Sequence, residues 1–116
     1  KKIKWSFGFY TTHSVGFFIK KTSQLKVGLY NLKYKFSSDY DLFYRMIVHF
    51  KLKGMATKKE EIFGKFRSGG FSSRISYLEY LIENTKIRLD NGQNIIFVYA
   101  IFLARFLRNF RKVINF

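Results

Sequence analysis

The pattern of apolar and polar positions is clearest in the middle of the chain, where it predicts a helix over residues 39 to 51. The apolar side chains recur at the spacing of one helical face and are Leu42, Phe43, Met46, Ile47 and Phe50. Ser38 is a natural N-cap, and Asp41, three residues later, stands where a capping box has its acidic partner. The helix is expected to stop near Gly54.

Two acids, Asp39 and Asp41, fall in the first turn of this helix. The positive end of the helix dipole stabilises carboxylates there by ~0.3–1 kcal/mol, so their presence needs no chemical role. Asp41 and Arg45 are four residues apart and are expected to pair on one face. The chain has only 7 Asp and Glu residues against 22 Lys and Arg, so an acidic pair in one turn stands out.

The pattern also predicts a few short strands. Residues 14 to 19 are rich in β-branched and aromatic side chains and predict a buried strand, with His13 at its start. Alternating aromatic residues in segment 1 to 8 suit a strand or an extended entry. Two further strands are predicted over residues 55 to 57 and 62 to 67, and Gly69-Gly70 follows them as a loop.

Two other helices are predicted on either side of the central one. Thr22 or Ser23 caps a short helix through residue 26, and Gly28 is placed to end it with a left-handed backbone. Ser72 or Ser73 caps a later helix that Asn91-Gly92 ends. The expected inner face of that later helix is Ile75, Leu78, Leu81 or Ile82, Thr85 and Leu89.

The last predicted helix begins near Gln93 and is basic and amphipathic. Residues 95 to 104 carry no charge, which falls short of the roughly 20 apolar residues that a membrane-spanning helix needs. Cations then alternate with apolar side chains and are Arg105, Arg108, Arg111 and Lys112. Such a helix lies flat at a membrane interface, covers the protein's own core or packs on a partner helix, and the pattern leaves these alternatives open.

Charge and composition limit the class of protein. The formal net charge of +15 attracts phosphates in nucleic acid, anionic lipid or nucleotide-sugar, although compositional drift toward lysine accounts for part of it. The absence of cysteine excludes disulfides, thiolate metal sites and cysteine nucleophiles. The 116 residues suit one small domain, show no signal peptide and open on Lys1, so we expect a piece of a longer protein.

Four segments in order resemble a known family. They are Thr12-His13-Ser14, Gly28-Leu29-Tyr30-Asn31, Asp39-Tyr40-Asp41-Leu42 and Gly69-Gly70-Phe71-Ser72. Together they resemble the C-terminal, acceptor-side half of bacterial family 2 glycosyltransferases of the GT-A fold, over about residues 10 to 80. The resemblance implies an α/β fold (α+β as an isolated piece), with few short strands packed by three to four helices and the long basic helix at the end. Asn31 departs from the family, which usually has Asp there, but an Asn side chain closes the same turn.

The resemblance also implies roles for individual residues. Asp39 matches the general base that deprotonates the acceptor, with Asp41 and Arg45 in support; the alternative for Asp39 is a helix cap only. The residues expected to contact substrate are His13, Ser14, Tyr40, Arg67, Gly69, Gly70 and Ser72. A histidine at a strand edge is more often a hydrogen-bonded structural residue, and the functional alternative for His13 is contact to the diphosphate, the acceptor or, as a weak candidate ligand, the metal. Gly69-Gly70 is alternatively a plain turn. A divalent metal, Mg or Mn, is implied for the full enzyme, with its ligands mostly outside this chain.

The resemblance therefore predicts an inverting glycosyltransferase of envelope polysaccharide synthesis. Residues 1 to 92 would form its acceptor-side part and residues 93 to 116 the basic helix. Its partners would be a nucleotide-sugar donor, a glycan or polyprenyl-linked acceptor and an anionic membrane surface, with no nucleic acid expected. The location would be cytoplasmic, with attachment to the inner face of the cytoplasmic membrane left open. The alternatives are a non-enzymatic basic binding module for anionic membrane or nucleic acid, and a fragment without activity of its own.

Overall fold

The computed structural model describes residues 16–55, 58, 60–62, 64–65, 67, 69–70 and 74–114. All of the regular secondary structure in those residues is helical, and they include no strand. The helices in chain order are α2 (Lys21–Val27), α3 (Ser38–Tyr44), the π-helix η1 (Arg45–His49), α4 (Tyr77–Asp90), α5 (Ile95–Arg108) and α6 (Phe110–Ile114).

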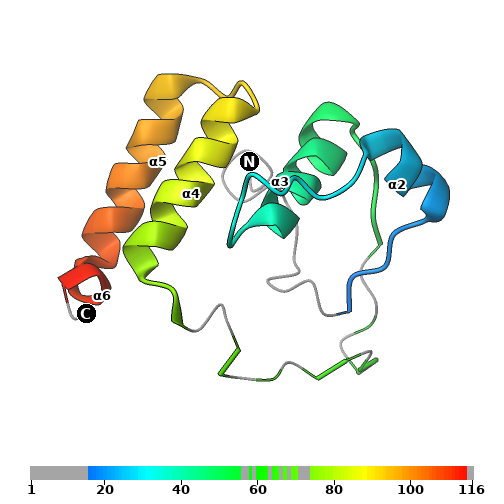
Figure 1. Ribbon diagram of the computed structural model, residues 1–116, viewed down its shortest axis with the longest axis horizontal. Helices are drawn as coiled ribbons and strands as arrows, with labels where there is room; N and C mark the ends of the chain where they lie inside the picture. Colours follow the sequence, from blue (N-terminus) through cyan, green and yellow to red (C-terminus); the bar gives the residue numbers. More distant parts are fainter. Residues whose placement is uncertain are drawn as a thin grey trace.

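Helices α4 and α5 run antiparallel and side by side, and α3 packs against α4 (Figure 1). Helix α2 lies beyond α3, on the side away from α5 (Figure 1). One buried cluster joins α2 to α3 and η1 and consists of Val27, Leu42, Phe43 and Met46. The buried apolar side chains of the α4–α5 hairpin are Leu81, Ile87, Val98 and Ile101.

The predicted α/β fold is wrong for the described part of the chain. In the first predicted strand, Gly16 has a φ of 82° and residues 17–20 have no regular structure. Phe17 packs edge-on against Phe43, with ring centroids 4.6 Å apart, and Ile19 joins the same cluster. A short apolar run can bury itself against helices as well as in a sheet, and periodicity does not separate the two cases.

The described residues of the other predicted strands carry no strand either. Met55 and Ile62 are 99% and 81% exposed, so neither has the buried face that a half-buried strand requires. Segment 1 to 8 and His13 lie outside the described residues.

The central helix starts where the sequence predicts but is built differently. Its N-cap is Ser37, which makes no side-chain capping bond, so the predicted capping box of Ser38 and Asp41 is wrong. After Tyr44 the helix widens into η1, where Phe50 N–H donates to the Arg45 carbonyl at 2.9 Å. Lys51, with a φ of 50°, ends it before Gly54.

Helix α4 has a capping box that the sequence contained and the prediction missed. The Ser76 hydroxyl accepts from Glu79 N–H at 3.1 Å, and the Glu79 carboxylate accepts from Ser76 N–H at 3.0 Å. The helix therefore begins at Tyr77 rather than after Ser72 or Ser73. Its end at Asn91-Gly92 is confirmed, with a φ of 75° at Gly92.

The inner face of α4 is rotated from the predicted one. Its buried residues are Leu81, Asn84, Ile87 and Arg88, while Leu78, Thr85 and Leu89 are half-buried. Of the predicted face only Leu81 is fully enclosed, because two polar side chains, Asn84 and Arg88, occupy positions that a hydrophobicity pattern assigns to the surface.

Helices α2 and α5 agree better with the pattern. The N-cap of α2 is Lys20, so Thr22 and Ser23 are not caps, but Gly28 ends the helix with a φ of 92° as expected for a positive-φ position. Helix α5 begins after Asn94, whose side chain accepts from Phe97 N–H at 3.1 Å. Within the described ranges, every helix is too short or too polar to cross a bilayer.

Candidate functional site

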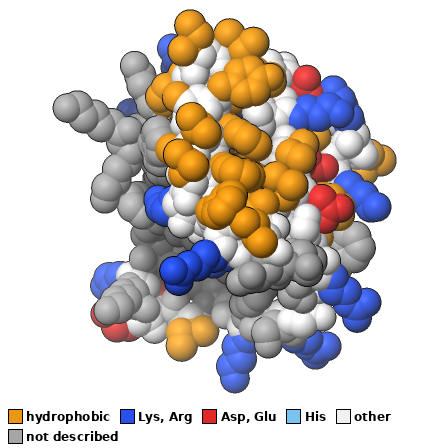
Figure 2. Space-filling view, turned by 90° about the vertical axis from the view of Figure 1, so that its left-hand side faces the viewer, with side chains coloured by type: hydrophobic (Ala, Val, Ile, Leu, Met, Phe, Trp, Pro, Cys, Tyr) orange, Lys and Arg blue, Asp and Glu red, His pale blue; other side chains and the backbone are white. Residues whose placement is uncertain are grey.

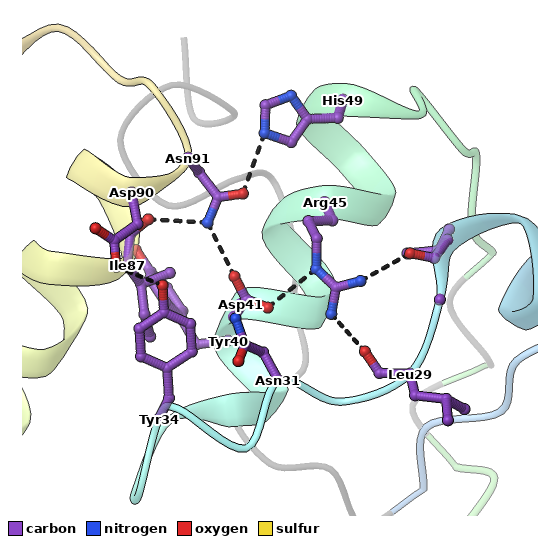
Figure 3. A network of polar contacts seen from close by, with 12 residues as sticks. Leu29, Asn31, Tyr34, Tyr40, Asp41, Arg45, His49, Ile87, Asp90 and Asn91 are labelled. Carbon is purple, nitrogen blue, oxygen red and sulfur yellow. Dashed lines mark hydrogen bonds and ion pairs between the residues drawn. The ribbon is translucent and has the colours of Figure 1, made fainter.

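Of the two acids that open α3, Asp41 is a structural one. Its side chain is only 3% exposed. One carboxylate oxygen accepts from Arg45 Nε at 3.0 Å and the other from Asn91 Nδ2 at 2.9 Å (Figure 3). Since Asn91 follows α4, the carboxylate ties the first turn of α3 to the far end of α4.

Arg45 extends this connection to the end of α2. Its Nη1 donates to the Val27 carbonyl at 2.7 Å and its Nη2 to the Leu29 carbonyl at 2.8 Å (Figure 3). These carbonyls lie at and just beyond the C-terminal end of α2, where carbonyl groups have no intrahelical donor. The predicted pairing of Asp41 with Arg45 is therefore present, and it holds three segments together rather than one helix face.

Asn91 and His49 complete the network. Asn91 Nδ2 also donates to the Ile87 carbonyl at 2.9 Å, and its Oδ1 lies 3.1 Å from His49 Nε2. From the sequence, Asn91 was predicted only to end a helix. Its contact with Asp41 spans 50 positions, and no local pattern encodes such a pair.

The neighbouring loop is held by two more acids of α4. Asp90 accepts from Lys33 Nζ at 2.7 Å and from the Tyr34 hydroxyl at 2.8 Å, and Glu83 accepts from the N–H groups of Lys35 and Phe36. Burial and the Asp90 carboxylate raise the pKa of the Tyr34 hydroxyl, which therefore stays a donor. The Asn31 side chain closes its turn onto Lys33 N–H at 3.1 Å, as predicted for an Asn at this position.

The Asp90 contacts make stability depend on acid pH. Hydrogen bonds from Lys33 and Tyr34 hold the pKa of Asp90 below its ordinary value. A lowered pKa in the folded state stabilises the fold above the unfolded value of about 3.9, and this contribution is lost as the pH falls further. We expect the urea midpoint of Asp90→Asn to fall less than that of the parent between about pH 5 and pH 3.

The matched control is Glu60→Gln, which removes an exposed carboxyl outside this network. Its pH profile should follow that of the parent. If the Asp90→Asn and parent profiles coincide, the Asp90 contacts contribute nothing to folding.

Asp39 is placed very differently from Asp41. It is half-buried, and its Oδ1 accepts from the N–H of the next residue, Tyr40, at 2.8 Å. Among the described residues no cation pairs with it. The carboxylate is thus bonded to the backbone of its own turn at the start of α3.

Tyr40 points into the protein rather than outward. Arg88 Cζ lies 5.9 Å from the centroid of the Tyr40 ring, and burial raises the pKa of Tyr40 to about 12. Arg88 is itself 1% exposed and donates to Gln93 Oε1 at 2.9 Å, and its pKa is lowered by burial. The ring therefore packs between α3 and α4, and its predicted contact to substrate stays a prediction.

The other predicted substrate contacts stay predictions. Arg67, Gly69 and Gly70 are exposed, and Gly69 has the φ of 86° that a turn favours. His13, Ser14 and Ser72 lie outside the described residues.

The metal that the resemblance implies, with ligands mostly outside this chain, stays a prediction. Nowhere in the described part of the chain do three His, Asp or Glu side chains gather as ligands.

A scan against protein-family models and searches of curated proteins and of solved structures found no match for this chain. The resemblance to family 2 glycosyltransferases therefore rests on the sequence motifs alone.

Proposed function

We propose that this chain supplies the acceptor side of an inverting glycosyltransferase in which Asp39 is the general base. The sugar would pass from a nucleotide-sugar to a glycan or lipid-linked acceptor of envelope polysaccharide synthesis. The proposed activity is the one that the motifs imply. The α/β fold is not part of the proposal, because the described residues do not adopt it.

This proposal rests on the different surroundings of two neighbouring acids. Asp41 is buried and both of its oxygens are occupied by Arg45 and Asn91, so it has no role left but support. Asp39 stands two residues away without a partner cation among the described residues. If both acids only interacted favourably with the helix dipole, their surroundings would not need to differ in this way.

The chemistry requires one proton acceptor at the attacking hydroxyl. As the acceptor oxygen forms its bond to the anomeric carbon, its proton passes to the Asp39 carboxylate. The bond from that carbon to the diphosphate oxygen breaks, and the nucleoside diphosphate leaves with the electron pair. A carboxylate within about 3 Å of the acceptor hydroxyl performs this step as a general base.

The activity is tested on the natural gene product that contains this segment. Purified protein is mixed with nucleotide-sugars and with polyprenyl-linked or oligosaccharide acceptors, and the release of nucleoside diphosphate is followed together with labelling of the acceptor. Release that depends on an acceptor supports the proposal. Absence of transfer, combined with steeply salt-dependent binding of oligonucleotides, would replace it with the basic binding module.

A further inference from the structure

Helix α5 is apolar on every side and yet mostly uncovered. Its sequence, IIFVYAIFLARFLR, has charges only at Arg105 and Arg108. A helix that is hydrophobic all round is ordinarily buried, but only Val98 and Ile101 are buried here. Packing on α4 therefore uses one side of α5 and leaves the opposite side without a partner among the described residues.

The uncovered side is a continuous stripe rather than scattered residues. Ile96, Tyr99, Leu103 and Leu107 follow at steps of three and four, and each is more than half exposed. Phe110 and Ile114 of α6 carry the exposed series onward. Figure 2, which views the molecule from the side on which α5 lies in Figure 1, shows apolar side chains gathered on this face. Exposed apolar patches of this kind mark sites of interaction with a protein, a membrane or a ligand.

The charged side chains of the segment that carries this stripe indicate what covers it. Residues 93 to 116 include four cations and no acid. Three of the cations, Arg108, Arg111 and Lys112, are exposed and line an open hollow of about 450 Å³ at the corner between α5 and α6. The apolar stripe thus ends in a cationic corner on a chain whose net charge is +15.

We propose that this face docks on the surface of an anionic phospholipid bilayer. Helix α5 lies in the plane of the interface, with the stripe among the upper acyl chains and the corner cations among the lipid phosphates. A second copy of the chain fits less well, because it would bring further cations and no acid in this segment to neutralise them. The proposal concerns location and not chemistry, so it does not depend on the role of Asp39.

Flotation of the full chain with vesicles tests the proposal. Vesicles of phosphatidylcholine alone are compared with vesicles that also contain phosphatidylglycerol, and binding is expected only to the second kind. Leu103→Asn should weaken this binding about tenfold because an apolar side chain no longer enters the bilayer. Arg108→Gln with Arg111→Gln should weaken it about 25-fold, since each cation near the surface contributes roughly fivefold.

Matched controls use equally exposed residues outside the face. Leu32→Asn alters a leucine that is 94% exposed, and Lys20→Gln with Lys21→Gln removes two exposed cations. Both should bind as the parent does apart from a small loss from net charge. Asp39→Asn should bind fully even if it has no activity, which separates failure of this proposal from failure of the catalytic one.

Three results would overturn the proposal. One is equal binding to both kinds of vesicle, and another is equal loss in Leu32→Asn and Leu103→Asn. The third is a chain that ignores vesicles but forms a dimer that Leu103→Asn dissociates, which would assign the face to a second copy.

Discussion

Replacing Asp39 with asparagine is expected to lower the rate of sugar transfer by about 10²–10⁴-fold, the usual contribution of a general base. The amide has nearly the size of the carboxylate but cannot accept the proton of the acceptor hydroxyl. Its oxygen can still accept from Tyr40 N–H, so the start of α3 should be preserved. Binding of the nucleotide-sugar should be unchanged, which a titration of the variant would measure beside its turnover.

The stability of Asp39→Asn distinguishes catalysis from folding. Removing one first-turn carboxylate costs up to ~1 kcal/mol through the helix dipole, which is too little to account for a lost activity. Asp39→Glu keeps the base on a longer side chain and should recover part of the rate. If Asp39→Asn turns over like the parent, Asp39 is not the base.

Replacing Asp41 with asparagine is expected to reduce the free energy of unfolding by about 3 kcal/mol, because breaking a largely buried ion pair leaves a charge without its partner. Arg45 would keep its bonds to the Val27 and Leu29 carbonyls but lose its counter-ion. The new amide would also turn a donor toward Arg45 or Asn91, both of which are donors at these contacts. Urea unfolding followed by circular dichroism measures the loss.

A double-mutant cycle assigns that loss to the pair. Arg45→Gln and Asp41→Asn should be less costly together than the sum of the single changes, because each removes the partner that the other leaves unpaired. Additive costs would mean that the ion pair between them contributes little.

The local features of the fold were predictable because the signals for them are local. The first turn of α3, the end of α4 at Asn91-Gly92 and the pairing of Asp41 with Arg45 all follow from residues within one or two turns of one another. The Ser76 and Glu79 capping box was equally readable, since it needs only a serine and a glutamate three residues apart. The prediction placed the cap earlier, at the neighbouring serines.

The strands were mispredicted because their signal is ambiguous. The run that includes Phe17 and Ile19 has the composition of a buried strand, yet what buries it is the cluster of α2 and α3. The widening at η1 carries no sequence signal that amphipathic spacing reveals. Which partner an apolar segment finds is decided by tertiary packing, and a resemblance to an α/β family favoured the wrong choice here.

The long-range contacts of the site could not be predicted from the sequence either, because tertiary packing decides them. Asn91 meets Asp41 across 50 positions, and Arg88 is buried under the ring of Tyr40. An arginine in an amphipathic helix is ordinarily assigned to solvent, so its burial appears only once α3 and α4 are packed together.

The central claim, that one acid of this helix turn does chemistry and its neighbour holds the fold, is tested most directly by the transfer rates of Asp39→Asn and Asp41→Asn measured side by side, at a temperature at which both variants are folded. The account predicts that Asp39→Asn loses transfer while its unfolding midpoint stays near that of the parent, and that Asp41→Asn keeps most of its transfer at a clearly lower midpoint. Full transfer by Asp39→Asn, or equal loss of transfer in both variants, would contradict it.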